Sequence, residues 1–133
     1  MTHRRAGISP SLEDYLEAVL ELSCEDGGAR TTDIADRLDV SKASVNQAIS
    51  LLVERRLARR EKYGPVYLTD DGIAAAEVIR KRHMAIKSFL TDVLGVDEET
   101  AEKDACQIEH VVSAKTMACL INFMEKTKKR TKR

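Results

Sequence analysis

The sequence predicts a mainly α-helical chain in two parts, in which three helices and a β-hairpin are followed by a second, wholly helical part. Apolar residues recur at helical spacing through most of the chain. A short stretch near its middle is typical of two strands around a Gly-Pro turn, and helical spacing resumes after it. With 133 residues, 43% of them hydrophobic, the chain is long enough to bury a core. We place the first part at 1–72, the second at 73–126 and a basic tail at 127–133.

The first helix is expected to follow Ser9-Pro10-Ser11, because serine and proline are typical of a helix start. Its end is expected near Asp26-Gly27-Gly28. One apolar stripe follows the helical repeat between these points, made of Leu12, Tyr15, Leu16, Val19 and Leu20. The segment is therefore an amphipathic helix.

Two short helices come next. The chain's second helix is expected to be capped by Thr32 and its third helix by Ser41. Only Asp39 and Val40 separate them, and the small Ala35 stands where they must approach. Two short helices joined by so tight a turn are typical of a helix-turn-helix. Asp39 replaces the usual turn glycine, and aspartate tolerates a left-handed backbone better than most residues.

Residues 57–69 are expected to form two short strands around Gly64-Pro65, which after a helix-turn-helix would be a wing. A long helix should then run from about Asp71 to Gly95. Asp97 is expected to cap a fifth helix that continues to Val112, and Ser113 a sixth. The apolar stripe of the long helix consists of Ala76, Ile79, His83, Ile86, Leu90 and Val93.

Several classes of protein are excluded by composition. No stretch approaches the ~18 consecutive apolar residues of a membrane helix, and the N-terminus lacks the apolar core of a signal peptide, so we expect a cytoplasmic protein with no membrane partner. Cys24, Cys106 and Cys119 are widely spaced, which disfavours a disulfide framework or a zinc ribbon. The apolar faces after Gly72 exceed what so small a part can bury, and we therefore expect a homodimer.

The formal net charge is zero, but the charge is unevenly spread. Six acidic residues and one lysine lie between Asp97 and Glu109, whereas 126–133 holds six basic residues and no acidic one. The acidic block is where a cation would be expected. The basic run is interpreted as a frayed, solvated end, with non-specific phosphate attraction as the alternative.

The third helix and the wing carry side chains suited to double-stranded DNA. Asparagine and glutamine amides can pair with adenine, and serine, lysine and arginine with phosphates or bases. The alternative is an ordinary solvated surface; the tight turn followed by a basic hairpin favours DNA binding. The candidates are Ser41, Lys42, Ala43, Ser44, Asn46, Gln47, Arg59, Arg60 and Lys62.

Two sets of residues are candidate metal ligands. Asp14 and Glu17 are three apart on the first helix, so their carboxylates can converge on one cation, although Ser11 and Asp14 also fit a capping box and Glu17 fits a solvated surface. Cys106, Glu109 and His110 stand at i, i+3 and i+4 of one expected helical face and offer a thiolate, a carboxylate and an imidazole. The alternatives are a small buried cysteine or a thiol-histidine dyad, for which no oxyanion turn is apparent. His83, on the apolar stripe, is by itself more typical of a hydrogen-bonded core histidine.

Five segments, in this order, resemble the iron- and manganese-dependent repressors of the diphtheria-toxin-repressor family. The resemblance extends from about Ser9 to Met124 and rests on residues 9–17, 32–38, 61–69, 82–83 and 104–111. It implies a homodimeric transcriptional repressor, not an enzyme, that binds palindromic operators of metal-uptake genes once Mn²⁺ or Fe²⁺ is bound, with Co²⁺ or Zn²⁺ as substitutes. It also implies that the second part is a metal-binding and dimerisation domain. By position, the family's metal ligands correspond to Asp14, Glu17, His83, Cys106, Glu109 and His110.

The sequence mixes two branches of that family. Asp14 and Glu17 resemble the manganese branch, whereas Cys106 resembles the iron branch. Lys87 stands where the iron branch has the glutamate of its ancillary site, so an iron-type ancillary site is not expected. A paired site near Glu17, His83, Cys106 and Glu109, as in the manganese branch, stays open. Because the larger members append an SH3-like domain and this sequence ends before one, we expect the short, two-domain form.

Metal ligands in both parts of the chain would let an ion fix the first helix to the second part and so favour operator binding. Two other classes remain open. One is a winged-helix regulator that senses an organic ligand or thiol oxidation through Cys106. The other is a small metalloenzyme that uses Glu109 or His110 as a base on a metal-bound water.

Overall fold

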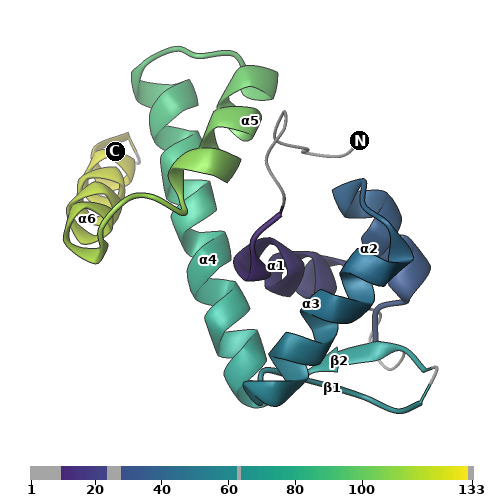
Figure 1. Ribbon diagram of the computed structural model, residues 1–133. Helices are drawn as coiled ribbons and strands as arrows, with labels where there is room; N and C mark the ends of the chain where they lie inside the picture. Colours follow the sequence, from purple (N-terminus) through teal and green to yellow (C-terminus); the bar gives the residue numbers. More distant parts are fainter. Residues whose placement is uncertain (1–9, 24–27, 63, 132–133) are drawn as a thin grey trace. The chain divides into compact units, whose positions relative to one another are not determined.

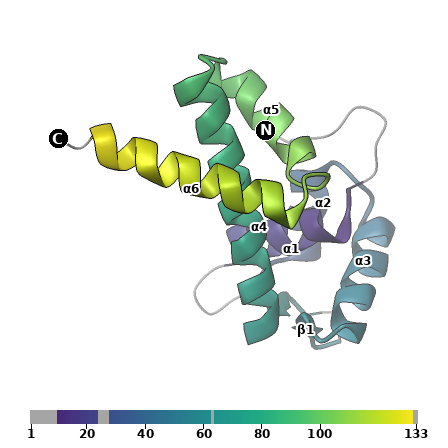
Figure 2. The same ribbon diagram turned by 90° about the vertical axis from the view of Figure 1, so that its left-hand side faces the viewer.

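The computed structural model describes residues 10–23, 28–62 and 64–131, with side chains as far as residue 128. The chain divides into two compact units, Met1–Ile79 and Arg80–Arg133. Most of the described residues are helical, as predicted (Figures 1 and 2). The elements, in chain order, are α1 (Leu12–Leu22), α2 (Thr31–Leu38), α3 (Lys42–Glu54), β1 (Ala58–Arg60), β2 (Val66–Leu68), α4 (Asp70–Ser88), the π-helix η1 (Phe89–Val93), α5 (Glu98–Ile108) and α6 (Ala114–Thr131).

The first unit is built on the helix-turn-helix that the sequence predicts. Between α2 and α3, Asp39 adopts a left-handed backbone with φ 55° and ψ 52°, which confirms the expectation for this position. Ser41 caps α3, and its hydroxyl accepts the backbone N–H of Ser44 at 3.0 Å. One apolar core joins the three helices to the strands and is centred on the fully buried Val19, Ile34, Val45, Ile49, Leu52 and Val66.

The predicted wing is a two-stranded antiparallel hairpin in which Ala58 pairs with Leu68 and Arg60 with Val66. Gly72 lies where the chain leaves the hairpin. A Cβ at that position would lie 1.9 Å from the carbonyl oxygen of Leu57, so only glycine fits this approach. The hairpin and the first turn of α4 are therefore held in close contact.

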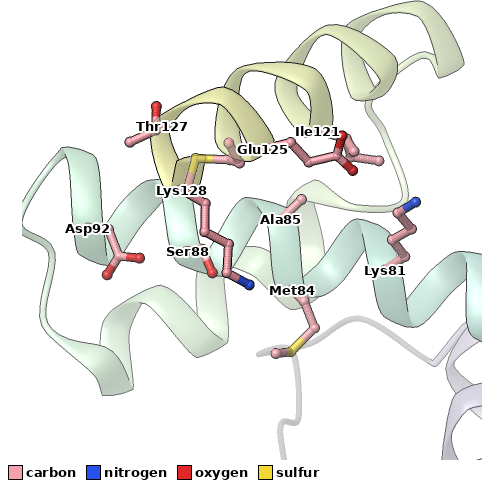
Figure 3. Close-up of a pocket in the computed structure, with 10 residues that line it drawn as sticks. Lys81, Met84, Ala85, Ser88, Asp92, Ile121, Glu125, Thr127 and Lys128 are labelled. Atoms are coloured by element: carbon pink, nitrogen blue, oxygen red, sulfur yellow. The ribbon is translucent and has the colours of Figure 1, made fainter. Parts of the chain in front are cut away.

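The second unit contains the C-terminal part of α4 with η1, α5 and α6. Its core is small, with Ile86, Ala105 and Met117 buried at its centre. A hollow of about 550 Å³ lies between α4 and α6, with Met84, Ala85 and Ile121 among its lining residues (Figure 3). No described helix is both long and apolar enough to cross a membrane.

Several sequence expectations need correction. Thr32 does not cap α2, which begins at Thr31 after Arg30. The fifth helix ends at Ile108 instead of continuing to Val112. The basic run is helical as far as Thr131 rather than frayed, and Val93 on the expected apolar stripe is 42% exposed.

The first helix ends at Leu22, before the expected Asp26-Gly27. Asp26 and Gly27 lie outside the described residues, as do Ser9, Cys24 and Tyr63. The helix start at Ser11 and the caps at Asp97 and Ser113 are found as predicted.

Candidate metal centre and nucleic-acid interface

Facing positions on α4 and α5 bring the candidate ligands of the second unit together. His83 lies on α4 and is 6% exposed. Glu102 and Cys106 lie one helical turn apart on α5, which puts both on the face that packs against His83. The start of α5 is fixed by Asp97, whose carboxylate accepts the backbone N–H of Thr100 at 3.0 Å.

The two ring nitrogens of His83 face different groups. Nε2 lies 2.9 Å from Glu102 Oε2, which is hydrogen-bond distance. Nδ1 lies 3.9 Å from Cys106 Sγ and 3.6 Å from Glu109 Oε1. The imidazole therefore stands between one carboxylate on its Nε2 side and a thiol with a second carboxylate on its Nδ1 side.

Glu109 and His110 lie at the C-terminal end of α5. Glu109 is the C-cap residue and keeps a helical backbone, with φ −58° and ψ −23°. The His110 backbone N–H bonds to the carbonyl of Gln107 at 3.3 Å, so the chain tightens after Ile108. The helical course predicted for Cys106, Glu109 and His110 is kept as far as Glu109, whose backbone N–H bonds to the Ala105 carbonyl at 3.1 Å, and His110 Nε2 lies 3.5 Å from Glu109 Oε1.

The Glu109 carboxylate is the most unusual group of the second unit. Its side chain is 0% exposed, and neither oxygen accepts a hydrogen bond from any described residue. Removing a carboxylate from water without hydrogen bonds costs several kcal/mol, and such groups in proteins are paired or coordinate metals. An imidazole nitrogen lies 3.5 Å away on one side and another 3.6 Å away on the other. A buried carboxylate with no hydrogen bond and an imidazole nitrogen on either side has the surroundings of a metal ligand.

Protonation in this cluster follows from burial and charge. Burial alone would lower the pKa of His83, but its contacts with Cys106, Glu109 and Glu102 outweigh burial and raise the pKa to about 11. Burial raises the pKa of the Cys106 thiol. Without metal, the cluster therefore holds an imidazolium and a neutral thiol at neutral pH.

The donor set of the second unit fits a divalent cation. Atoms that bind one ion at ~2.0–2.3 Å lie roughly 3–4 Å from one another. The separations of 3.5 to 3.9 Å that join His83 Nδ1, Cys106 Sγ, Glu109 Oε1 and His110 Nε2 into one chain of donors fall in that range. His83, Glu102 and Cys106 also form a group of metal-capable side chains.

The other two candidate ligands, Asp14 and Glu17, lie on α1 in the first unit. Asp14 Oδ2 accepts the backbone N–H of Ser11 at 2.8 Å, and the Ser11 hydroxyl is 3.3 Å from the Asp14 backbone nitrogen. The capping box considered as the alternative role of Asp14 is therefore present. A carboxylate has a second oxygen, so this role and metal binding are compatible.

Glu102 and its neighbour Lys87 were not among the predicted site residues. Lys87 Nζ lies 3.1 Å from Glu102 Oε1 and 3.3 Å from Glu98 Oε1. Glu102 precedes Cys106 by four residues, so the i, i+4 rule that linked Cys106 to His110 would have found it if applied toward the N-terminus.

The start of α3 presents the predicted DNA-reading residues at the surface. Lys42, Ala43, Asn46 and Gln47 are exposed. The hydroxyls of Ser41 and Ser44 lie 3.0 Å apart. The Ser41 hydroxyl also caps α3, where it accepts the backbone N–H of Ser44.

The wing is tied to the recognition helix by arginine. Arg60 donates to Asn46 Oδ1 at 2.9 Å and to Thr31 Oγ1 at 3.2 Å, so it joins β1 to both helices of the helix-turn-helix. Arg59 Cζ lies 4.5 Å from the centre of the Tyr67 ring, a cation–π distance. Lys62 is exposed in the loop between the strands.

Two family models together cover most of the chain. The N-terminal DNA binding domain of the iron dependent repressor matches residues 7–66, and its metal binding and dimerisation domain matches residues 69–132. The chain belongs to the iron-dependent repressor family. The resemblance read from the sequence is thereby confirmed, and the family consists of repressors and not enzymes.

Proteins similar to this chain include transcriptional regulators from archaea and bacteria. An uncharacterised HTH-type transcriptional regulator of Methanocaldococcus jannaschii is 36% identical over 91% of this chain and 98% of its own length. The transcriptional regulator MntR of Salmonella typhimurium is 36% identical over 92% of this chain and 75% of its own. A solved manganese-dependent transcriptional repressor in complex with manganese is 30% identical, with a TM-score of 0.74 over 83% of this chain. The chain spans 50% of that solved protein.

Proposed function

We propose that this chain is a homodimeric, metal-dependent transcriptional repressor, which binds operator DNA of metal-uptake genes in the cytoplasm when a divalent cation occupies its metal centre. The observation that carries the proposal is the buried Glu109 carboxylate, which accepts no hydrogen bond from a described residue and has an imidazole nitrogen on either side. We assign residues 1–72 to DNA binding and 73–126 to metal binding and dimerisation.

The proposed ligands come from both units of the chain. His83, Cys106, Glu109 and His110 supply nitrogen, sulfur and oxygen donors from the second unit, and Asp14 and Glu17 supply carboxylates from α1. A bound dication would supply the positive charge that these carboxylates need to lie together. Without it, Asp14, Glu17 and Glu109 repel one another, so the two units are free to change their spacing.

Fixing one unit on the other selects the separation of the two recognition helices in the dimer. Half-sites on B-DNA lie about 34 Å apart, or a multiple of that distance, so a dimer with fixed spacing binds both at once. A coupling of ~1–3 kcal/mol changes DNA affinity by roughly 5–150-fold. Exposed apolar residues are available for the dimer contact, among them Met84, Val111 and Phe123.

The amide of Gln47 is the best candidate for base recognition on α3. Gln47 is exposed, whereas the oxygen of Asn46 is engaged by Arg60. Glutamine can pair with adenine through both its oxygen and its nitrogen. We assign Lys42, Arg59 and Lys62 to phosphates, and Ser41, Ala43 and Ser44 to the close approach of the helix start to the DNA backbone.

The proposed metal is Mn²⁺ or Fe²⁺. Carboxylates favour the hard Mn²⁺, while a thiolate suits Fe²⁺, Co²⁺ or Zn²⁺, and raw affinity rises along the series from Mn²⁺. One thiolate among several carboxylates and imidazoles is compatible with both proposed ions. Co²⁺ and Zn²⁺ would serve as substitutes in the test tube.

A redox role for Cys106 has less support. Cys106 is 9% exposed, and burial raises the pKa of its thiol. Redox-sensing cysteines are typically accessible and have a lowered pKa. The surroundings of Cys106 therefore favour a ligand over an oxidation sensor.

The proposal is tested by an anaerobic DNA-binding titration. The probe is a duplex selected from a random-sequence pool by the Mn²⁺-loaded protein, titrated with Mn²⁺, Fe²⁺, Co²⁺ and Zn²⁺ after chelation. Wild type is compared with Glu109→Gln, Cys106→Ala and Asp14→Met, and with Glu99→Gln as a control on an exposed acid of α5. We expect metal to tighten binding by wild type and the control, and much less by the ligand variants. DNA affinity that is indifferent to every metal would refute the proposal.

A further inference from the structure

Glu102 has no role among the proposed ligands, yet it makes the shortest polar contact of the metal-site histidine. Its Oε2 lies 2.9 Å from His83 Nε2. Its Oε1 lies 3.1 Å from the ammonium of Lys87, one turn along α4 from His83. The side chains of Glu102 and Lys87 are 22% and 25% exposed, so this chain of contacts leads from the surface to the buried ring.

Two roles for Glu102 can be distinguished by charge. As a ligand, it would share one cation with His83 Nε2 and Cys106, whose Sγ lies 3.8 Å from Glu102 Oε2. A dication at that point would lie close to the Lys87 ammonium, and like charges ~5 Å apart repel by roughly 3 kcal/mol or more even at an effective dielectric of 20. The hydrogen bond with Glu102 raises the pKa of Lys87, so this ammonium stays charged.

The groups on the Nδ1 side of the His83 ring are the Glu109 carboxylate and the Cys106 thiol. Glu109 Oε1 lies 3.6 Å from Nδ1, and the oxygens of Glu109 accept no hydrogen bond from described residues. Cys106 Sγ lies 3.9 Å from the same nitrogen. The Lys87 ammonium therefore makes the Nε2 side less favourable for a cation than the Nδ1 side.

We infer that Glu102 is the positioning residue of the metal centre: it accepts the Nε2–H of His83, is itself held by Lys87, and so presents His83 Nδ1 to the metal. This inference rests on the proposed function, because it requires a metal at His83, Cys106 and Glu109. A carboxylate that accepts the free N–H of a ligating histidine fixes the ring's tautomer and orientation and makes the imidazole a stronger donor.

The arrangement also explains why a lysine is present at position 87. A lysine that holds Glu102 supplies, from within the chain, the positive charge that balances the outer carboxylates Glu98 and Glu102. It leaves the inner carboxylate, Glu109, to the metal. Glu98 and Glu102 are thus paired with the Lys87 ammonium, and Glu109 is left to bind the metal ion.

Nitrogen-15 NMR of the full-length, Zn²⁺-loaded protein tests the inference directly. Long-range ¹H–¹⁵N correlations report which ring nitrogen of a histidine is bound to metal and which carries a proton, and the chain has only three histidines. We expect His83 to be bound through Nδ1 and protonated on Nε2. Binding through Nε2 would overturn the inference and would make Glu102 a ligand instead.

Zn²⁺ affinity of substituted proteins provides a second readout, measured by competition with a chromophoric chelator. Glu102→Ala removes the acceptor and should weaken binding by about 10–100-fold, the usual cost of losing such a partner. Glu102→Gln keeps an acceptor oxygen and should lose clearly less. Glu99→Gln, an exposed acid on the same helix, should match wild type. Equal losses for Glu102→Gln and Glu102→Ala, or none for either, would refute a positioning role.

These outcomes separate the inference from the proposed function. If wild-type protein binds no divalent metal, the proposed function fails. If wild type binds Zn²⁺ with Cys106 as a ligand, but His83 is bound through Nε2 or Glu102→Ala has full affinity, only the positioning role fails. Cysteine ligation is followed separately, from the thiolate-to-metal charge-transfer absorption of the Co²⁺-loaded protein.

Discussion

Replacing Glu109 with glutamine should separate the metal role of this residue from any structural one. The side chain is 0% exposed, and its oxygens accept no hydrogen bond from described residues. Glutamine has nearly the same shape without the charge, so it removes the cost of burying a carboxylate that accepts no hydrogen bond and also removes the attraction of that carboxylate to the His83 imidazolium. Because these two effects oppose each other, we expect the free energy of unfolding of the metal-free protein to change by no more than about 1 kcal/mol.

The metal-loaded protein should behave differently. At a metal concentration of 100 times the dissociation constant, binding stabilises wild type by about 2.7 kcal/mol. If Glu109→Gln weakens binding 100-fold, the same concentration stabilises the variant by only about 0.4 kcal/mol. At roughly 3–5 °C per kcal/mol for a chain of this size, a metal-induced rise of about 10 °C in Tm should fall to about 2 °C.

The assay is thermal unfolding followed by circular dichroism at 222 nm, with chelator and then with Mn²⁺ or Zn²⁺. Glu99→Gln is the matched control, since it removes an exposed carboxylate from the same helix. A full metal-induced rise in Tm for Glu109→Gln would refute the reasoning. So would a loss of more than about 3 kcal/mol in the metal-free variant, which is typical of a broken buried ion pair.

Three further predictions concern the protonation of the metal-free cluster, the link from the wing to α3, and the packing of Gly72 at the start of α4. Because the pKa of His83 is raised from about 6.5 to about 11, metal-free protein should lose stability as pH rises from about 6.5 to 9, and the raised pKa of the Cys106 thiol adds to the loss only above about 9. Metal replaces these protons, so the rise in Tm on adding metal should grow over the same range. Arg60→Ala should weaken binding to the selected duplex by about tenfold, through loss of the link to Asn46 and of a nearby charge. Gly72→Ala should lower the free energy of unfolding by about 1–3 kcal/mol, because its Cβ would meet a backbone carbonyl.

Each of these has a control and a contradicting result. A Tm of the metal-free protein that is constant from pH 6.5 to 9 would contradict the protonation scheme, and His83→Gln should abolish most of the slope. Arg60→Lys keeps the charge but not the paired hydrogen bonds; wild-type affinity in Arg60→Ala would exclude a role for the link. Gly64→Ala, where the nearest atom would be 3.4 Å away, is the control for Gly72, and equal stability of the two variants would contradict the packing argument.

Local features of the sequence predicted the local features of the fold. The left-handed turn at Asp39 and the cap at Ser41 depend on a residue's own backbone preference and on a hydrogen bond within three residues, so a single sequence contains the information. The hairpin was equally clear from its Gly-Pro turn. The exact start of α2 was not, because Arg30 precedes it without any side-chain cap.

The end of α5 could not be predicted because the signal lies in the next helix. No glycine or proline follows Ile108. The cap at Ser113 begins α6, and the bond from His110 to Gln107 already tightens the chain before it. Helical spacing alone would have placed Glu102 beside Cys106, but its contact with His83 arises from the packing of α4 on α5 across 19 residues of sequence, which the sequence does not show.

The reciprocity between metal and DNA tests the central claim most directly. The measurement is the affinity of the full-length protein for Mn²⁺ under anaerobic conditions, with and without a saturating concentration of the selected duplex. If metal and DNA are coupled through the spacing of the two units, the duplex must tighten Mn²⁺ binding by the same factor by which Mn²⁺ tightens DNA binding, roughly 5–150-fold. Equal Mn²⁺ affinity with and without the duplex would contradict the account.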